Sequence, residues 1–152
     1  MIKILFVCHG NICRSTMAEF LFKYEIKRRS LDDMFYVESA GTSSEEIGNP
    51  VHYGTRRILD RFKIDYSKKR ARQIVKSDYE KFDYIIGMDE YNRRNLVRFF
   101  NGDNKHKISL ILDYTPLPRD VDDSWYSGDF EQTYLDIIEG INALLDKINV
   151  RK

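Results

Sequence analysis

The N-terminal stretch 2-IKILFVCHGNICRSTMAEFLFKYEIKR-28 places three elements in a row. Residues 2–7 form a short run rich in β-branched and other apolar side chains, which predicts a buried strand. A loop that contains glycine follows at 8–15. Apolar residues then recur with helical spacing in the segment 16–28: Met17, Phe20, Leu21 and Tyr24. The stretch therefore predicts a strand, a tight loop and an amphipathic helix.

The same alternation continues along the chain. Further strands are predicted at 36–42, 82–88 and 108–112. Helices are predicted at 49–62, with Asn49 as cap and Pro50 as first residue, at 90–100, and from Asp129 onward, with Ser127 or Asp129 as cap. Alternating strands and helices indicate βαβ units, so we expect one α/β domain over residues 1–152, with a parallel sheet covered on both faces. Ligands bind outside the carboxyl ends of such strands, which directs attention to loop 8–15.

Composition and charge exclude several classes of protein. The 152 residues are 42% hydrophobic and 32% charged, as in soluble globular proteins. The 25 basic and 24 acidic side chains give a net charge of +1, which argues against a nucleic-acid-binding protein. We see no signal peptide and no apolar run long enough to span a membrane, and two cysteines are too few to staple a fold. We therefore expect a cytoplasmic protein without membrane contacts.

Loop 8–15 contains the residues of an anion-binding site. A loop that enters a helix directs backbone N–H groups toward an oxyanion, and Gly10 with a left-handed Asn11 would let the backbone curl tightly enough. Arg14 can grip two oxygens with its planar fork. Cys8 at the base of this positive cup should have a lowered pKa and be a thiolate. Ser15 is placed to donate a hydrogen bond to that sulfur.

Each of these residues also has an ordinary structural explanation. Cys8 alone would be read as a small buried side chain at a strand end, and Arg14 alone as a surface cation on the next helix. Their combination with Gly10 and Ser15 between a strand and a helix favours a functional site.

The stretch from Phe6 to Ser15, followed by Met17-Ala18-Glu19, resembles the signature of the low-molecular-weight protein tyrosine phosphatases. The resemblance extends over almost the whole chain at these segments: Ser39-Ala40-Gly41-Thr42, Ile47-Gly48-Asn49-Pro50, Ala71-Arg72-Gln73-Ile74, Phe82-Asp83-Tyr84-Ile85 and Met88-Asp89 with Asn95-Leu96. It implies a three-layer α/β fold, a four-stranded parallel sheet with helices on both faces and a phosphate-binding loop after the first strand.

The resemblance also implies an activity, the hydrolysis of phosphotyrosine monoesters through a cysteinyl-phosphate intermediate. Cys8 would be the nucleophile and Arg14 the phosphate clamp. The remaining loop residues would contact the substrate: His9, Gly10, Asn11, Ile12, Cys13 and Ser15. The expected partners are a phosphotyrosine-containing protein or an aryl phosphate, with inorganic phosphate as product, and the chain would be a monomer or weak dimer.

In the implied reaction, attack of the thiolate on a phosphate monoester expels an alkoxide or phenolate, so a carboxylic acid should protonate the leaving oxygen and then activate water. An acidic side chain from elsewhere in the chain must therefore reach the loop. The family carries this general acid in an Asp-Pro pair before two aromatic residues. Alignment of Trp125 and Tyr126 with those aromatics assigns Asp123 as the acid and places Ser124 where the proline is usual. The loss of proline frees the loop, so Asp122 could partly replace Asp123. A solvated acidic loop without catalytic function is the other interpretation.

Other positions bear on the support of the loop and on the substrate. Lys69 stands where the family often has a histidine that helps to brace Asn11, whose network includes Ser15 and Ser39. Ile12 is typical of phosphotyrosine enzymes, whereas relatives that hydrolyse phosphoarginine carry threonine there. Trp125 and Tyr126 could form flat walls for a phenyl ring, or could simply pack under the loop.

Cys13 is either a packing residue or a redox partner of Cys8, and in the family this pair forms a reversible disulfide. Phosphoarginine phosphatase, thiol-coupled arsenate reductase and a non-catalytic anion-binding module remain as alternatives. An arsenate reductase needs further cysteines downstream, and none follows Cys13. Three scattered histidines and two loop cysteines give no zinc spacing, so we expect no metal and no cofactor.

Overall fold

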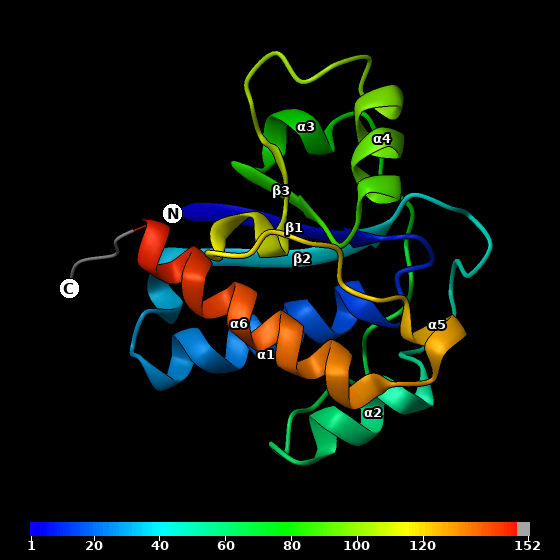
Figure 1. Cartoon of the computed structure of the whole chain (residues 1–152), viewed down its shortest axis with the longest axis vertical. Helices are drawn as coiled ribbons and strands as arrows, with labels where there is room; N and C mark the ends of the chain where they lie inside the picture. Colours follow the sequence, from blue (N-terminus) through cyan, green and yellow to red (C-terminus); the bar gives the residue numbers. More distant parts are fainter. Residues whose placement is uncertain (149–152) are drawn as a thin grey trace.

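The computed structural model describes residues 1–148 (Figure 1). Its strands are β1 (Ile2–Cys8), β2 (Phe35–Gly41), β3 (Tyr84–Gly87) and β4 (Ile108–Leu110). Its α-helices are α1 (Arg14–Arg28), α2 (Tyr53–Asp60), α3 (Asp78–Lys81), α4 (Glu90–Phe99), α5 (Ser124–Ser127) and α6 (Phe130–Ile148). Two short 3-10 helices are η1 (Asp32–Met34) and η2 (Ile111–Tyr114). The predicted α/β fold is confirmed.

The four strands form one parallel sheet in the order β2-β1-β3-β4. β1 is central, and along it side chains alternate between the two faces. Ile4 and Phe6 belong to the core that includes residues of α1 and α6, whereas Leu5 and Val7 pack with Phe82 and other residues near α3 and α4. Helices therefore cover both faces, as expected (Figure 1).

The helix predicted at 49–62 is shorter than expected. It begins at Tyr53, and its cap is His52, whose Nδ1 accepts a hydrogen bond from the Gly54 N–H at 3.1 Å. Asn49 is engaged elsewhere, because its carbonyl accepts from the Ala71 N–H at 2.9 Å. The prediction of Asn49 as cap and Pro50 as first residue was wrong, since tertiary contacts decide where this helix begins.

Other boundaries differ less. The strand predicted at 108–112 ends at Leu110, where Asp113 Oδ2 accepts from the Leu110 N–H at 2.9 Å and the chain turns into η2. Asp129 caps α6, since its Oδ1 accepts from the Gln132 N–H at 3.0 Å. The sequence did not predict α3 and α5, because helices of four residues are too short to show a period.

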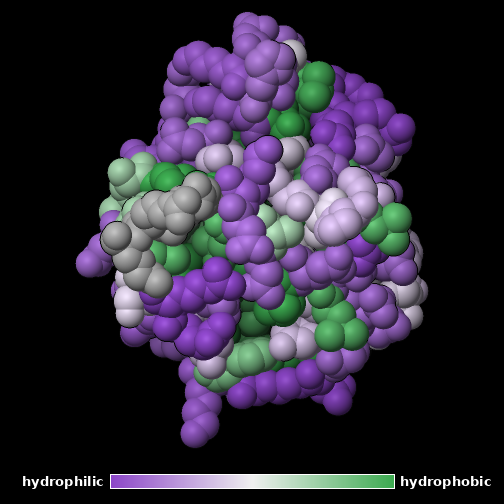
Figure 2. Space-filling model, turned by 60° about the vertical axis from the view of Figure 1, so that its left-hand side comes forward, coloured by the Kyte–Doolittle hydropathy of each residue, from purple (hydrophilic) through white to green (hydrophobic). Residues whose placement is uncertain are grey.

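Hydrophilic side chains dominate the face shown in Figure 2, and hydrophobic residues lie between them in patches. Within residues 1–148, no helix is both long and apolar enough to cross a membrane.

The carboxyl ends of β1 and β2 hold the loop that follows β1. Thr42 N donates to Cys8 O at 3.0 Å and Ser43 N donates to His9 O at 2.9 Å, so the two chains stay together beyond the ladder. A Cβ at Gly41 would lie 2.7 Å from His9 O. Glycine at 41 is therefore what lets the end of β2 approach the loop this closely.

Candidate active site

Loop 9–13 connects β1 to α1 and forms a cup at the end of the sheet. Cys8 is the last residue of β1 and is 3% exposed, and Arg14 is the first residue of α1. The N–H groups of the first turn of a helix lack acceptors within the helix and favour an anion. A buried sulfur and a guanidinium thus flank a site suited to an oxyanion.

Asn11 gives the loop its sharp turn. It adopts φ 60°, whereas Gly10 is not among the glycines with positive φ, so the tight curl depends on Asn11 alone. The Asn11 Nδ2 group donates to Ser15 Oγ at 2.8 Å and to Ser39 Oγ at 2.9 Å, and Oδ1 accepts from the Arg72 N–H at 3.1 Å. These three contacts stabilise a conformation that is uncommon for a residue with a side chain.

The hydrogen bonds around Ser15 have a direction. Asn11 Nδ2 can only donate, so Ser15 Oγ accepts from it and keeps its own hydrogen for another partner. Cys8 Sγ lies 3.0 Å from Ser15 Oγ and is that partner. Ser15 Oγ is therefore placed where its hydroxyl can donate to the sulfur.

Ser39 continues this network away from the pocket. Its Oγ accepts from Asn11 and donates to Glu19 Oε1. Lys69 Nζ donates to the Ser39 carbonyl at 2.9 Å and lies 3.3 Å from Glu19 Oε1, and Lys23 pairs with Glu19 Oε2 at 2.7 Å. Burial lowers the pKa of Lys69, and the charge of Glu19 opposes this shift. Lys69 thus contacts both Ser39 and Glu19, the carboxylate that accepts from the Ser39 hydroxyl.

Two carboxylates hold the guanidinium of Arg14. Nη1 donates to Asp89 Oδ2 and to Val121 O, each at 2.8 Å, and Nη2 lies 3.5 Å from Asp123 Oδ2. Burial alone would lower the pKa of Arg14, but the negative charges of Cys8, Asp89 and Asp123 outweigh it and raise the pKa. Arg14 is therefore a fixed cation.

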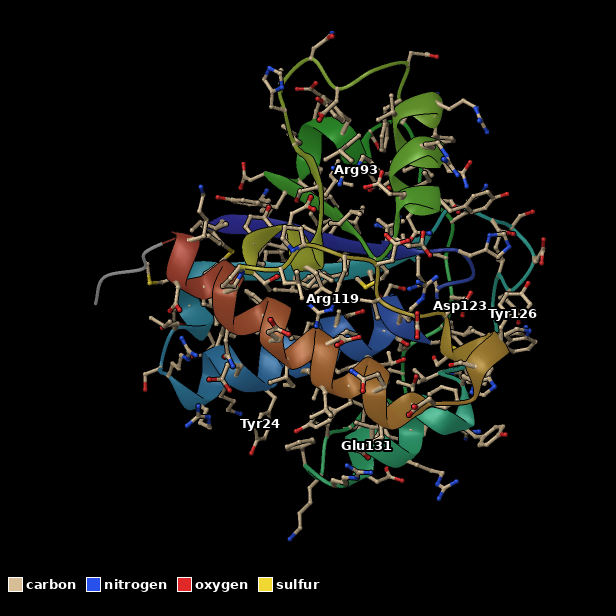
Figure 3. All side chains as sticks on the ribbon, in the orientation of Figure 1. Tyr24, Arg93, Arg119, Asp123, Tyr126 and Glu131 are labelled. Carbon is tan, nitrogen blue, oxygen red and sulfur yellow. The ribbon has the colours of Figure 1, made fainter. Side chains whose placement is uncertain are left out.

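Asp123 reaches the loop from the segment before α6. It caps α5, because its Oδ1 accepts from the Trp125 N–H at 3.1 Å, while Oδ2 faces Arg14. Figure 3 shows Asp123 and Tyr126 close together on the segment that carries α5. Asp122 is not among the pocket-lining residues, whereas Asp123 is.

A single pocket brings together most of the residues singled out in the sequence. It is lined by Cys8, His9, Gly10, Ile12, Cys13, Arg14, Asp123, Trp125 and Tyr126, together with Glu45 and Glu46. Four other residues do not line the pocket and are joined to one another by hydrogen bonds that support the loop: Asn11, Ser15, Ser39 and Lys69. The first group lines the pocket, and the second group of four residues, called the brace below, supports the loop.

The aromatic pair forms part of the pocket wall. Trp125 is 55% exposed and Tyr126 is 85% exposed, so they do not pack under the loop. The rings of Trp125 and His52 form a T-shaped pair with their centroids 5.3 Å apart, and the His52 ring stacks on that of Phe130 with the centroids 5.2 Å apart. His52 therefore positions one of the two walls.

Sequence reasoning missed several contributors to the site. Asp89 lies two residues after the end of β3, at the edge of the sheet where the loop after β1 also lies, and this position could have indicated it. Glu19 and Glu46 carried no comparable signal, because their roles depend on contacts between distant segments. In the described part of the chain, no group of three or more metal-ligating side chains comes together.

A cysteine at the end of a strand, an arginine on the next helix and a nearby carboxylate define the class of proteins that handle oxyanions with a thiol. Comparison with known proteins narrows this class. A family model described as low molecular weight phosphotyrosine protein phosphatase matches residues 3–152. The chain belongs to this family.

Individual relatives agree with this assignment. The low molecular weight protein-tyrosine-phosphatase YfkJ of Bacillus subtilis is 40% identical over 100% of this chain and 99% of its own length. Its crystal structure superimposes with a TM-score of 0.94 over 98% of this chain and 95% of that one. The human low molecular weight phosphotyrosine protein phosphatase is 40% identical over 95% of this chain and 94% of its own. A Drosophila arginine phosphatase also shares the fold, with a TM-score of 0.87 and 29% identity over 99% of this chain and 100% of that one.

Replacement of Lys69 by methionine should destabilise the brace. Lys69→Met keeps most of the volume but removes the donor to Ser39 O and one partner of Glu19. We expect the free energy of unfolding in urea to fall by about 1–3 kcal/mol. Lys68→Met, at an exposed neighbour, serves as the control and should change it little. Equal effects of the two substitutions would contradict the role of Lys69.

Ser124 carries a buried hydroxyl without a hydrogen-bond partner among the described residues. It is the first residue of α5, where proline is favoured, and Asp123 before it already has the extended backbone that proline requires. Ser124→Pro should therefore raise the free energy of unfolding by about 0.4–1 kcal/mol. Ser127→Pro should lower it, because Ser127 N donates to Asp123 O at 3.1 Å. A destabilised Ser124→Pro variant would contradict this reasoning.

Proposed function

We propose that the chain hydrolyses phosphotyrosine monoesters in proteins through a cysteinyl-phosphate intermediate. The observation that carries this proposal is the convergence of Cys8, Arg14 and Asp123 on one pocket, in a member of a phosphatase family. Each of the three supplies one requirement of the reaction: a nucleophile, an anion clamp and a proton donor.

In the binding step, the loop N–H groups and Arg14 hold the phosphate. Asp89 and Val121 O fix Nη1 of Arg14, so the guanidinium is oriented before the anion arrives. Such preorganised donors stabilise the charge that develops on the equatorial oxygens.

In the first chemical step, the Cys8 thiolate attacks phosphorus and the bond to the tyrosine oxygen breaks. Asp123 gives a proton to the departing phenolate. In the second step, Asp123 takes a proton from water, the water oxygen bonds to phosphorus and the S–P bond breaks. The products are inorganic phosphate and the regenerated thiolate. Ser15 favours this second departure because its hydroxyl donates to the sulfur.

The pocket walls support an aryl substrate. Trp125 and Tyr126 offer flat exposed faces, and Ile12 adds an apolar contact without a hydroxyl. The fold is shared with an arginine phosphatase, so the preference for tyrosine rests on these side chains. Arsenate reduction lacks the further cysteines that it needs, since none follows Cys13.

The setting of the enzyme follows from the same residues. All the proposed catalytic groups come from one chain, which is consistent with a monomer or weak dimer. Both cysteines are free, and a thiolate nucleophile is suited to a reducing compartment such as the cytoplasm.

A series of three variants tests the proposed roles. The unmodified protein should hydrolyse p-nitrophenyl phosphate in the presence of a chelator, and Cys8→Ser should abolish turnover. Asp123→Asn should reduce kcat by about 10²–10⁴-fold for aryl phosphates with poor leaving groups, and by less for good ones. Asp122→Asn is the matched control and should keep a rate close to that of the unmodified protein. Full activity of Asp123→Asn on poor leaving groups would show that another group is the acid.

We further propose that Cys13 protects Cys8 from irreversible oxidation. Burial, together with the negative charge of Cys8, raises the pKa of Cys13, so the resting thiol stays protonated. Peroxide converts the Cys8 thiolate to a neutral sulfenic acid, which removes that charge. Cys13 can then attack the oxidised sulfur, forming the disulfide and releasing water.

Peroxide treatment followed by a thiol reductant tests this protection. Activity of the unmodified protein should return almost fully, because the disulfide is reducible. Cys13→Ser should stay inactive, because its Cys8 proceeds to the sulfinic acid. Equal recovery of the two proteins would exclude a protective role. Intact mass should show loss of two hydrogens in the oxidised unmodified protein.

A further inference from the structure

A groove beside α4 shares one residue with the active-site pocket. This α4 groove is lined by four residues of α4, Tyr91, Asn95, Arg98 and Phe99, and by His9, Thr42, Ser43 and Ile74 from other segments. His9 also lines the pocket that holds Cys8. The two hollows are therefore neighbours across a single side chain, and Figure 1 shows α4 next to the segment that follows β2.

The α4 side of the groove is a continuous helix face. Tyr91, Asn95 and Arg98 follow one another at intervals of four and three residues, which places them on one face. Tyr91 is 59% exposed, and Ile74 is buried opposite this face. The groove thus offers the exposed ring of Tyr91 as a contact for an apolar side chain of a bound peptide.

Arg98 gives the groove a positive end. Its Nη1 donates to Asn95 Oδ1 at 3.2 Å, and within residues 1–148 no carboxylate lies at ion-pair distance from it. By contrast, Arg93 on the same helix pairs with Glu90 and Asp113. Arg98 is therefore an exposed cation whose charge is available to a partner.

The rim of the pocket carries negative charge next to His9. Glu45 and Glu46 line the pocket, and Glu45 Oε2 lies 3.5 Å from His9 Nε2. A carboxylate in a bound peptide is repelled by these two side chains and attracted toward Arg98.

We propose that the α4 groove binds the residues next to phosphotyrosine in a protein substrate, with an apolar side chain against Tyr91 and a carboxylate at Arg98. The proposal rests on the function proposed above and adds the sequence of the substrate to it. The main chain of a peptide whose phosphotyrosine fills the pocket must extend over the rim, and the groove lies on one of the paths that it can take. Small aryl phosphates end inside the pocket and do not reach the groove.

Two phosphotyrosyl peptides that differ in one residue test the charge. Each carries leucine next to phosphotyrosine and then either glutamate or lysine, on the amino-terminal side in one pair and on the carboxyl-terminal side in another. The ratio of kcat/KM for glutamate over lysine should exceed one in at least one pair. Arg98→Glu should reduce that ratio about tenfold, while kcat/KM for p-nitrophenyl phosphate stays unchanged.

Lys27→Glu is the matched control. It makes the same change in net charge at the far end of α1, and should leave the peptide ratio as in the unmodified protein. Tyr91→Ala should raise KM for the leucine peptides relative to alanine peptides, and Val97→Ala, on the same helix outside the groove, should not.

The outcomes separate the two proposals. If p-nitrophenyl phosphate and the peptides are hydrolysed but the ratio is the same in Arg98→Glu as in the unmodified protein, the groove proposal is wrong and the phosphatase function stands. If no phosphate ester is hydrolysed at all, both proposals fail. A reduced ratio accompanied by an equal loss with p-nitrophenyl phosphate would also overturn the groove, since the pocket itself would then be damaged.

Discussion

The left-handed backbone of Asn11 is the constraint on which the site depends. The turn it makes brings Cys8 and Arg14 to the same cup, and the three contacts of its side chain come from α1, β2 and the segment before α3. Both hydrogens of its amide nitrogen and the amide oxygen are used, so the orientation of the amide is determined by its partners. A local strain in the loop is thereby stabilised by elements distant in sequence.

The Asn11 amide also fixes the direction of its hydrogen bonds to the two serine hydroxyls, which both accept from it. Because Asn11 donates to both serines, their hydroxyl hydrogens are left for other partners: Ser39 donates to Glu19, and Ser15 lies within hydrogen-bond distance of Cys8. Lys69 completes the series at its outer end, where it contacts Glu19. Lys69 therefore supplies a charged hydrogen-bond donor at the outer end of the brace.

The sequence predicted what is local and missed what is tertiary. The period of apolar residues and the glycine-containing loop predicted β1, α1 and the position of the site, because strand and helix patterns depend on neighbours in the chain. The start of α2 could not be predicted. Asn49 has the side chain of a helix cap, but its carbonyl accepts from the N–H of the distant Ala71 and is not available to the first turn of a helix. Cys8 was predicted from its own loop, whereas Asp89 contacts Arg14 from the cap of α4. No pattern within one segment contains such a pairing, and the groove beside α4 was missed for the same reason.

Two carboxylates, those of Asp89 and Asp123, contact the guanidinium of Arg14 at different distances. Asp89 accepts from Nη1 at 2.8 Å together with Val121 O, and both are anchored: Asp89 also caps α4, and Val121 N donates to Met88 O. Asp123 lies farther away, at 3.5 Å from Nη2, and caps a four-residue helix. In the proposed reaction, an oxyanion on the open side of Arg14 would compete with the weaker of these contacts, so we expect it to displace Asp123 and leave Asp89 in place. The proposed general acid would then be released to exchange protons, while the guanidinium that holds the phosphate keeps its orientation.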